Sequence, residues 1–343
     1  ICAQHLRQAG YSVVVIEKSR GAGGRVATRR LHNTRADHGI RYLEPQGEMV
    51  QQLIEIMCDR NLLQLWTETV SDFGSKSSHS LLNRYVSAAG MNSIGKFLAT
   101  HLEIWFSRRV IALTPTNSKT WHLTLEVLGD SEHPAELTAA AVVVAIPAPQ
   151  ALMLLTTTKG LTSEFIDKLR SVEYDPCITV MAGYSPERHQ DLATQDLEWK
   201  AISFPNDSYL AWIGLDSSKR QESQQPVFVV QSSASFAENY LEVPDLQQAG
   251  KQLLERAGEH LMPWLSTPEW LQVHRWRYAF CQNPLPVSCL TSTNPPPLVC
   301  AGDWCNGNQI EGALNSGVAA ASWVNSTIAN NPLPNFNFIL RSL

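Results

Sequence analysis

The sequence predicts an α/β protein in which a domain built on a parallel sheet is interrupted by an α+β domain. Apolar, largely β-branched runs at 13–16 and 141–146 are typical of strands buried on both faces of a parallel sheet. A third short strand at 298–301 runs into a glycine, and a helix rich in small residues follows it. Between these elements, the runs at 177–184, 209–215 and 227–232 suit an antiparallel sheet. Nucleotide-type βα elements therefore stand at both ends of the chain, with a different domain between them.

The length of 343 residues is long for a single hydrophobic core and favours two domains. We expect the parallel-sheet domain to be discontinuous and to comprise residues 1–45, 86–150 and 290–330. The inserted domain would comprise residues 46–85 and 151–289.

Composition excludes several classes of protein. A net charge of -5 lacks the basic excess of a nucleic-acid binder, and no apolar run reaches the roughly 18 residues of a membrane span. The seven cysteines are scattered without a Cys-x-x-Cys motif, which indicates neither a disulfide framework nor a metal site. We therefore expect a cytoplasmic protein with no membrane, metal or nucleic-acid partner.

The remaining elements follow from apolar spacing and from turn residues. Residues 1–10 have the spacing of the back half of a helix that ends at Gly10, so we expect the sequence to start inside a domain. From there to residue 128, we expect a helix at 49–66, a serine-rich loop at 67–80, a helix at 91–98 and strands within 104–128.

The second half of the chain continues in the same way. We expect helices at 164–171, 245–265 and 311–329, a proline-rich linker at 284–297, and an irregular tail from 330.

Glu17 ends the first apolar strand. In a dinucleotide-binding fold, an acid at the tip of the second strand accepts hydrogen bonds from ribose hydroxyls, about 20 residues after the glycine-rich turn. Counting back from Glu17, the last glycine of that turn would lie roughly two residues before Ile1. The alternative for Glu17 alone is a solvated strand end.

A glycine-rich segment follows Glu17 and Lys18. Gly23 and Gly24 let the backbone approach a pyrophosphate closely, and their N–H groups can form an anion-binding concavity. Arg25 can add a charge-assisted hydrogen bond to phosphate. The alternative is a flexible turn with a surface arginine, but the acid at this offset favours phosphate binding.

The motif near the C-terminus is the strongest. Gly302 and Asp303 follow the last strand, and Glu311-Gly312-Ala313 opens the last long helix. Free N–H groups and the positive end of the helix dipole suit negative charge at this place. The alternative is a helix whose glycines and alanines serve close packing alone, which would explain the second half of this segment. It would not explain why a strand, Gly-Asp, a loop and Glu-Gly-Ala follow one another in this order.

Together with residues 37–42 and 90–94, these motifs resemble the renalase-like branch of the flavin amine oxidase superfamily over nearly the full length. The resemblance implies a Rossmann-like FAD-binding domain of the glutathione-reductase type. Cys305 follows the Gly-Asp motif, whereas the covalent cysteine of monoamine oxidases precedes it, so we expect non-covalent FAD. The cofactor contacts that the resemblance implies come from Glu17, Lys18, Gly23, Gly24, Arg25, Gly39, Val110, Gly302, Asp303, Glu311, Gly312 and Ala313.

The substrate cavity is expected to contain Tyr42, Arg277 and Tyr278. Tyr42 matches the aromatic residue that enters the cavity in this branch. Arg41 beside Tyr42, and Arg277 before Tyr278, place cations next to aromatic rings, which suits an anionic aromatic ligand. The alternative is that both arginines point to solvent, because neighbours on a strand face opposite sides. His38 is better explained as a core histidine than as a catalyst.

The resemblance implies hydride transfer to flavin N5 and reoxidation by oxygen to hydrogen peroxide. The small-molecule partner would be a reduced nicotinamide dinucleotide, such as a misplaced dihydronicotinamide isomer of NAD(P). Two alternatives stay open: an amine oxidase that acts on small amines, and a non-catalytic remnant that lacks the pyrophosphate-binding turn.

Overall fold

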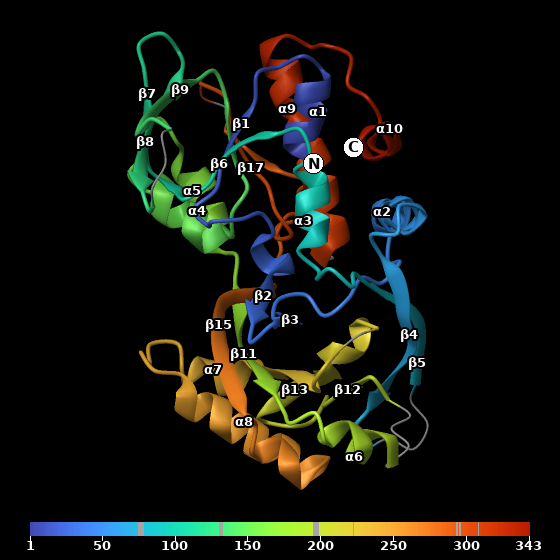
Figure 1. Ribbon diagram of the computed structural model, residues 1–343. Coiled ribbons are helices and arrows are strands. Elements are labelled where there is room, and N and C mark those ends of the chain that lie inside the picture. The colour runs from blue at the N-terminus through green and yellow to red at the C-terminus, as the bar shows by residue number, and fades with distance from the viewer. Residues whose placement is uncertain are drawn as a thin grey trace.

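The computed structural model describes residues 1–74, 79–129, 133–194, 199–221, 223–292, 294, 296–307 and 309–343. Its elements form two layered lobes, one above the other in Figure 1. The upper lobe carries both chain ends, and one large sheet dominates the lower lobe.

Two short parallel pairs form the centre of the upper lobe. β1 (Val14–Ile16) pairs with β6 (Glu103–Trp105), and β10 (Val142–Val144) pairs with β17 (Leu298–Cys300). The strands expected from the apolar runs at 13–16 and 141–146 thus each belong to a parallel pair, as predicted. The remaining elements around them are β16 (Leu290–Thr291), α1 (Cys2–Gln8), α3 (Ser93–Leu98) and α9 (Gln309–Ile328).

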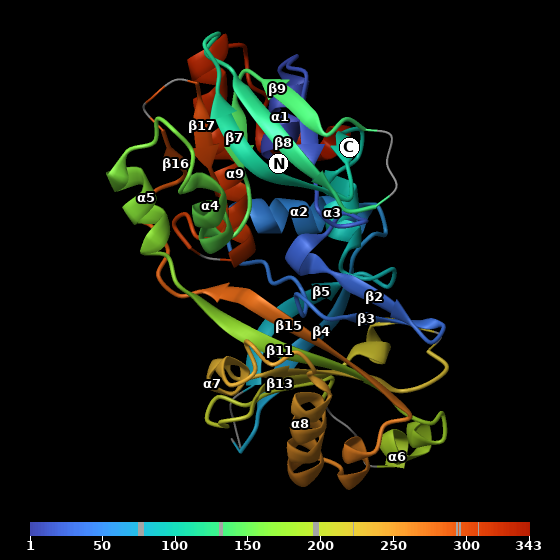
Figure 2. The same ribbon diagram turned by 90° about the vertical axis from the view of Figure 1, so that its left-hand side faces the viewer.

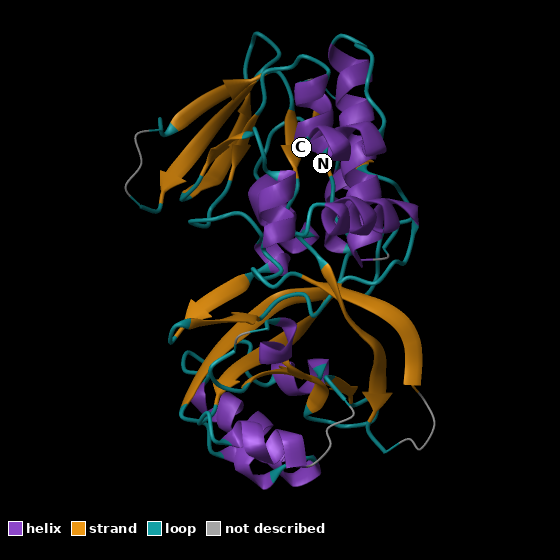
Figure 3. Cartoon of the chain, turned by 45° about the vertical axis from the view of Figure 1, so that its right-hand side comes forward, coloured by secondary structure: helices purple, strands orange, loops and turns teal. Residues whose placement is uncertain are grey.

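A separate three-stranded antiparallel sheet lies beside these pairs (Figures 2 and 3). It consists of β7 (Arg108–Pro115), β8 (Trp121–Val127) and β9 (Glu136–Ala139). Helices α4 (Ala148–Leu155) and α5 (Ser163–Arg170) share one hydrophobic cluster with this sheet and with β17. Their packing is therefore with the upper lobe, although we expected residues after 150 to belong to the inserted domain.

The lower lobe is built on a seven-stranded sheet in which one face points to the upper lobe and helices cover the other (Figure 3). All its neighbouring strands are antiparallel except the pair β12–β4. The strand order is β15 (Trp270–Cys281), β11 (Tyr174–Gly183), β14 (Val227–Ser232), β13 (Leu210–Leu215), β12 (Ala201–Ser203), β4 (Gln64–Asp72) and β5 (His79–Val86). The helices are α6 (Arg188–Thr194), α7 (Ala234–Glu238) and α8 (Gln247–His260).

A hairpin of β2 (Thr28–Leu31) and β3 (Thr34–Asp37) lies between the lobes (Figure 1). It follows a short 3-10 turn at Gly24–Val26, in which the glycine-rich segment ends. α2 (Glu48–Asp59) then packs against α9 and against α10 (Phe336–Ser342). α1 also packs against α9 and α10, so the two ends of the chain lie together in the upper lobe.

Four secondary-structure predictions were wrong in part. The helix expected at 49–66 ends at Asp59, and residues from Gln64 belong to β4. The serine-rich stretch forms the end of β4 and the start of β5, although residues 75–78 lie outside the described part. Polar side chains on the exposed side of these strands hid the alternation. The last helix of the inserted domain is shorter than expected, and the tail contains α10.

Among the described residues, no helix has both the length and the apolar character needed to cross a membrane.

Candidate active site

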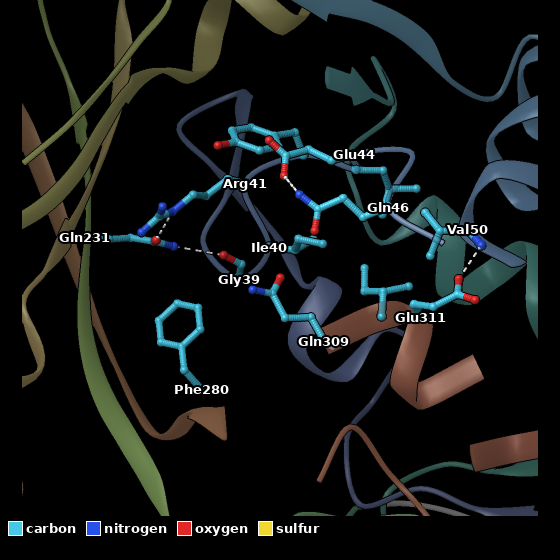
Figure 4. Close-up of a pocket in the computed structure, with 13 residues that line it drawn as sticks. Gly39, Ile40, Arg41, Glu44, Gln46, Val50, Gln231, Phe280, Gln309 and Glu311 are labelled. Carbon is cyan, nitrogen blue, oxygen red and sulfur yellow. Dashed lines mark hydrogen bonds between the residues drawn. The ribbon is translucent and has the colours of Figure 1, made fainter. Parts of the chain in front are cut away.

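A cavity of about 200 Å³ lies where the two lobes meet (Figure 4). Its walls come from the segment after β3, the start of α9, and the strands β14 and β15. The lining residues are Gly39, Ile40, Arg41, Tyr42, Leu43, Glu44, Gln46, Val50, Gln231, Phe280, Gln309, Ile310 and Glu311. Of the three residues predicted for the substrate cavity, Tyr42 is therefore the one that lines it.

Arg41 places a positive charge in this wall. Its Nε donates to Gln231 Oε1 over 2.6 Å, and the Gln231 amide donates to the Gly39 carbonyl over 2.9 Å (Figure 4). The guanidinium lies 5.1 Å above the Trp212 ring, and burial lowers its pKa. No described carboxylate forms an ion pair with it.

Tyr42 stands in an aromatic setting next to Arg41. Its ring centroid is 6.1 Å from that of Trp66 and 6.4 Å from that of Trp212. The Arg84 guanidinium lies 5.3 Å from the Tyr42 ring and is paired with Glu44. The ring is therefore held in position by its neighbours.

A buried network of four charges supports the Arg41 segment from behind. Asp37, Asp216 and Lys219 are fully buried, with Lys219 Nζ 2.8 Å from Asp216 and 3.1 Å from Asp37. Arg220 bonds both carboxylates, and Lys219 also donates to the Arg41 carbonyl over 2.8 Å. Sequence analysis missed this network because Lys219 and Arg220 occur in a polar stretch that resembles an exposed turn.

The charges of this network stabilise one another. Burial alone would raise the pKa of Asp216, but Lys219 and Arg220 outweigh it and lower that pKa. Burial alone would lower the pKa of Lys219, but the two carboxylates raise it. Asp216, Lys219 and Arg220 are therefore charged near neutral pH.

The glycine-rich segment packs tightly against its neighbours. Gly23 and Gly24 have φ angles of 144° and 52°, which glycine adopts readily. A Cβ on Gly39 would collide with the Arg25 carbonyl, and the Ile40 N–H donates to that carbonyl over 2.9 Å. The structure thus brings two of the predicted cofactor segments together.

Arg25 connects this segment to the C-terminal motif. It forms a bidentate pair with Asp303, with N–O distances of 2.6 and 2.7 Å, and Tyr174 donates to Asp303 over 3.2 Å. Burial opposes the charge of Arg25, but the bond to Asp303 outweighs it and raises the arginine pKa. Two residues predicted separately for the cofactor therefore meet.

Glu17, Lys18 and Val110 lie at one edge of the upper lobe. Glu17 stands just beyond the end of β1, and its carboxylate accepts from the Ser19 N–H over 2.7 Å. The Glu17 carbonyl accepts from the Arg108 N–H, which places β7 and Val110 beside this strand end. Lys18 is exposed.

The Glu-Gly-Ala segment is placed differently from expectation. Glu311 accepts from the Val50 N–H over 2.8 Å and from the Met49 N–H over 3.3 Å, so it caps α2 while lining the cavity. A Cβ on Gly312 would collide with the Gly307 carbonyl, so this glycine is required for packing. Gly302 donates its N–H to Ser316, and Ala313 is exposed.

Arg277 and Tyr278 do not line this cavity, although the substrate cavity was expected to contain them. Arg277 forms an ion pair with Glu242 over 2.6 Å and donates to the Leu241 carbonyl, away from the cavity. The Tyr278 ring contacts Tyr174, 5.9 Å away, and does not line the cavity.

His38 packs among rings from β15. Its ring lies 5.4 Å from Trp276 and 4.9 Å from His274, and burial lowers its pKa to about 3. This agrees with a core histidine that stays neutral. Within the described ranges, no three His, Cys, Asp or Glu side chains gather as metal ligands.

Comparisons with protein families and with solved structures identify proteins that are similar to this chain. Residues 63–325 match the family model of flavin containing amine oxidoreductases, and residues 1–56 match that of NAD(P)-binding Rossmann-like domains. Similar solved structures include wild-type putrescine oxidase bound to putrescine, with a TM-score of 0.70 and 13% identity over 95% of this chain and 96% of that chain.

Two further structures share the fold at similarly low identity. Cyclohexylamine oxidase from Brevibacterium oxydans has a TM-score of 0.66 at 12% identity over 95% of this chain and 96% of that chain. A protein described as a protoporphyrinogen oxidase, from Exiguobacterium, has a TM-score of 0.62 at 13% identity and covers 95% of each chain.

Proposed function

Because the chain belongs to the family of flavin containing amine oxidoreductases, we propose that it binds FAD non-covalently and oxidises a reduced nicotinamide dinucleotide. The family assignment makes it a flavin-dependent oxidoreductase. What we propose beyond the family is the renalase-like branch, the non-covalent attachment of FAD and the identity of the substrate.

The residues present fit a flavin dinucleotide. Gly23, Gly24 and Gly39 keep side chains out of the glycine-rich segment, and Glu17 ends its strand with a carboxylate that can accept ribose hydroxyls. The first turn of α9 lines the cavity with the positive end of its helix dipole. Cys305 is buried, and burial raises its thiol pKa to about 11, which supports non-covalent binding.

When bound, FAD accepts a hydride from the substrate and passes two electrons to oxygen, which takes up two protons to give hydrogen peroxide. Arg41 would hold an anionic group of the substrate. Tyr42 and Phe280 supply ring surface against which a nicotinamide can pack. The hydrogen bond from Arg41 to Gln231 fixes the direction of the guanidinium.

The observation that carries this choice of substrate is the guanidinium of Arg41 in the cavity wall, with which no carboxylate of the described residues forms an ion pair. A fixed cation repels the ammonium form in which an amine first binds, but it attracts a dinucleotide phosphate. The amine oxidase alternative rests on the family and on the aromatic rings around Tyr42, which would also suit a small amine.

Anaerobic mixing tests the proposal. We expect flavin absorbance to bleach rapidly with 2- or 6-dihydro isomers of NAD(P), and slowly or not at all with putrescine or cyclohexylamine. Acid precipitation should release intact FAD into the supernatant. Rapid bleaching by an amine, with none by any dihydronicotinamide, would establish the alternative.

A further inference from the structure

A stripe of side chains runs along β15, the edge strand of the large sheet, and starts at the cavity. Because alternate residues of a strand share a face, Trp270, Gln272, His274 and Trp276 lie on one side and are half-buried. The pairing with β11 is irregular beyond Trp276, but Trp276 and the more exposed Phe280 pair with Cys177 and Asp175, which share a face of β11. Phe280 lines the cavity, and Trp276 lies about 7 Å further along the sheet, since the β11 partners are two positions apart. The stripe consists of Trp270, Gln272, His274, Trp276 and Phe280.

The β2–β3 hairpin faces this stripe and contributes rings to it. The His38 ring is stacked on Trp276 and meets His274 edge-on, and the Trp276 indole N–H donates to the His38 carbonyl over 2.7 Å. His32 stacks on Trp270 with ring centroids 4.8 Å apart. The stripe therefore offers aromatic rings that contacts from the hairpin hold in position.

Arg29 adds a cation without a partner to this surface. It lies on β2, on the same side of the hairpin as His38, and is half-buried. Among the described residues, its guanidinium makes no hydrogen bond or ion pair. Burial lowers the pKa of His38 and of His274, and the charge of Arg29 lowers both further, so these rings are neutral. His38 Nδ1 is buried and has no hydrogen-bond partner in the described part of the chain.

We propose that Arg29 and the β15 stripe bind the second, non-reacting nucleotide of the dinucleotide substrate. Arg29 would take a phosphate, and the indoles of β15 would take the base. A half-buried guanidinium without a carboxylate is an incomplete ion pair, and the forked donors of arginine match phosphate oxygens. Bases stack on tryptophan in a sequence-tolerant way. This subsite rests on the proposed function, which supplies the dinucleotide.

Arg30 provides a matched control. It follows Arg29 directly, is exposed and points to the other side of the hairpin. Arg29→Gln and Arg30→Gln remove the same charge from neighbouring positions. Arg29→Lys keeps the positive charge but loses the paired N–H donors of the guanidinium.

The first measurement is calorimetric binding of ADP-ribose, which lacks nicotinamide, to the flavin-loaded enzyme. Arg29→Gln should weaken binding about 10-fold or more, Arg29→Lys less, and Arg30→Gln should leave it unchanged. The second measurement is steady-state turnover of a dihydronicotinamide dinucleotide and of its mononucleotide. Arg29→Gln should raise KM for the dinucleotide and leave KM for the mononucleotide unchanged.

The outcomes separate the two proposals. ADP-ribose binding that depends on Arg29 would support the subsite even if no dihydronicotinamide bleaches the flavin, in which case only the proposed reaction fails. Equal ADP-ribose affinity in the wild type, Arg29→Gln and Arg30→Gln would overturn the subsite. So would an equal rise in KM for mononucleotide and dinucleotide, because Arg29 would then act at the cavity.

Discussion

At the scale of single residues, Arg41 is the side chain that distinguishes the substrate classes. Arg41→Gln should raise KM for an anionic substrate about 10- to 150-fold with little change in kcat, because it removes bonds to a charged group that binding uses. Arg277→Gln is the control, since Arg277 is paired with Glu242 outside the cavity. Steady-state kinetics with both variants checks this. An unchanged KM in Arg41→Gln would remove Arg41 from the binding site.

Lys219 is the residue whose loss should cost the most stability. Lys219→Met leaves Asp37 and Asp216 buried with fewer partners, which should lower the free energy of unfolding by about 3–5 kcal/mol. Lys168→Met, at an exposed helical pair, should change it by less than about 0.5 kcal/mol. Urea denaturation measures both, and similar values for the two variants would contradict the role of the network.

The same network predicts a pH dependence. The pKa of Asp216 is lowered in the folded protein, so its contribution to stability is present above its ordinary value and is lost as the pH falls. We therefore expect the free energy of unfolding to fall below about pH 4. In Lys219→Met this acid dependence should be shallower, because the pKa of Asp216 moves back towards its unfolded value. Denaturation curves between acid and neutral pH test the difference in slope.

At the scale of elements, tight backbone contacts decide where substitutions are tolerated. Gly39→Ala places a Cβ against the Arg25 carbonyl and should release the flavin, while Gly21→Ala meets nothing within 4 Å. Flavin content after purification, with circular dichroism as a check on folding, compares the two variants. Full flavin occupancy in Gly39→Ala would show that the Arg25 loop shifts without harm to the cofactor site.

Helix α2 depends on a carboxylate from α9. Glu311→Gln should destabilise the protein by about 0.5–2 kcal/mol, because it weakens the cap on the α2 N–H groups. Glu55→Gln, at an exposed position of α2, should change stability by less than about 0.5 kcal/mol. Thermal unfolding in the presence of saturating FAD separates this effect from cofactor loss. Equal stability of the two variants would mean that solvent satisfies the α2 N–H groups.

At the scale of the whole molecule, Arg25 joins the glycine-rich segment, the C-terminal motif and β11 of the lower lobe. Breaking its pair with Asp303 should cost about 1–3 kcal/mol, less than a fully buried pair, since the Arg25 side chain is 34% exposed. A double-mutant cycle with Arg25→Gln and Asp303→Asn measures this coupling. Additive effects of the two substitutions would show that the pair does not join the lobes energetically.

Local sequence patterns determined the strands at the two ends of the chain, the antiparallel strands between them and the glycine-rich turns. Runs such as Val14–Ile16 and Leu298–Cys300 carry their apolar character within a few residues, so neighbouring side chains suffice to predict a buried strand. The positive φ angles of Gly23 and Gly24 are also a local property, because glycine adopts such angles readily.

Only the tertiary structure decided what these segments contact. Asp37 and Lys219 are 182 residues apart in the chain, and Glu311 and Val50 are 261 apart. No local pattern records which distant carboxylate a buried lysine meets or which helix a glutamate caps. The direction of Arg277 likewise depended on the face that β15 turns towards the cavity, which the sequence leaves open because alternation defines two faces without saying which one is inside.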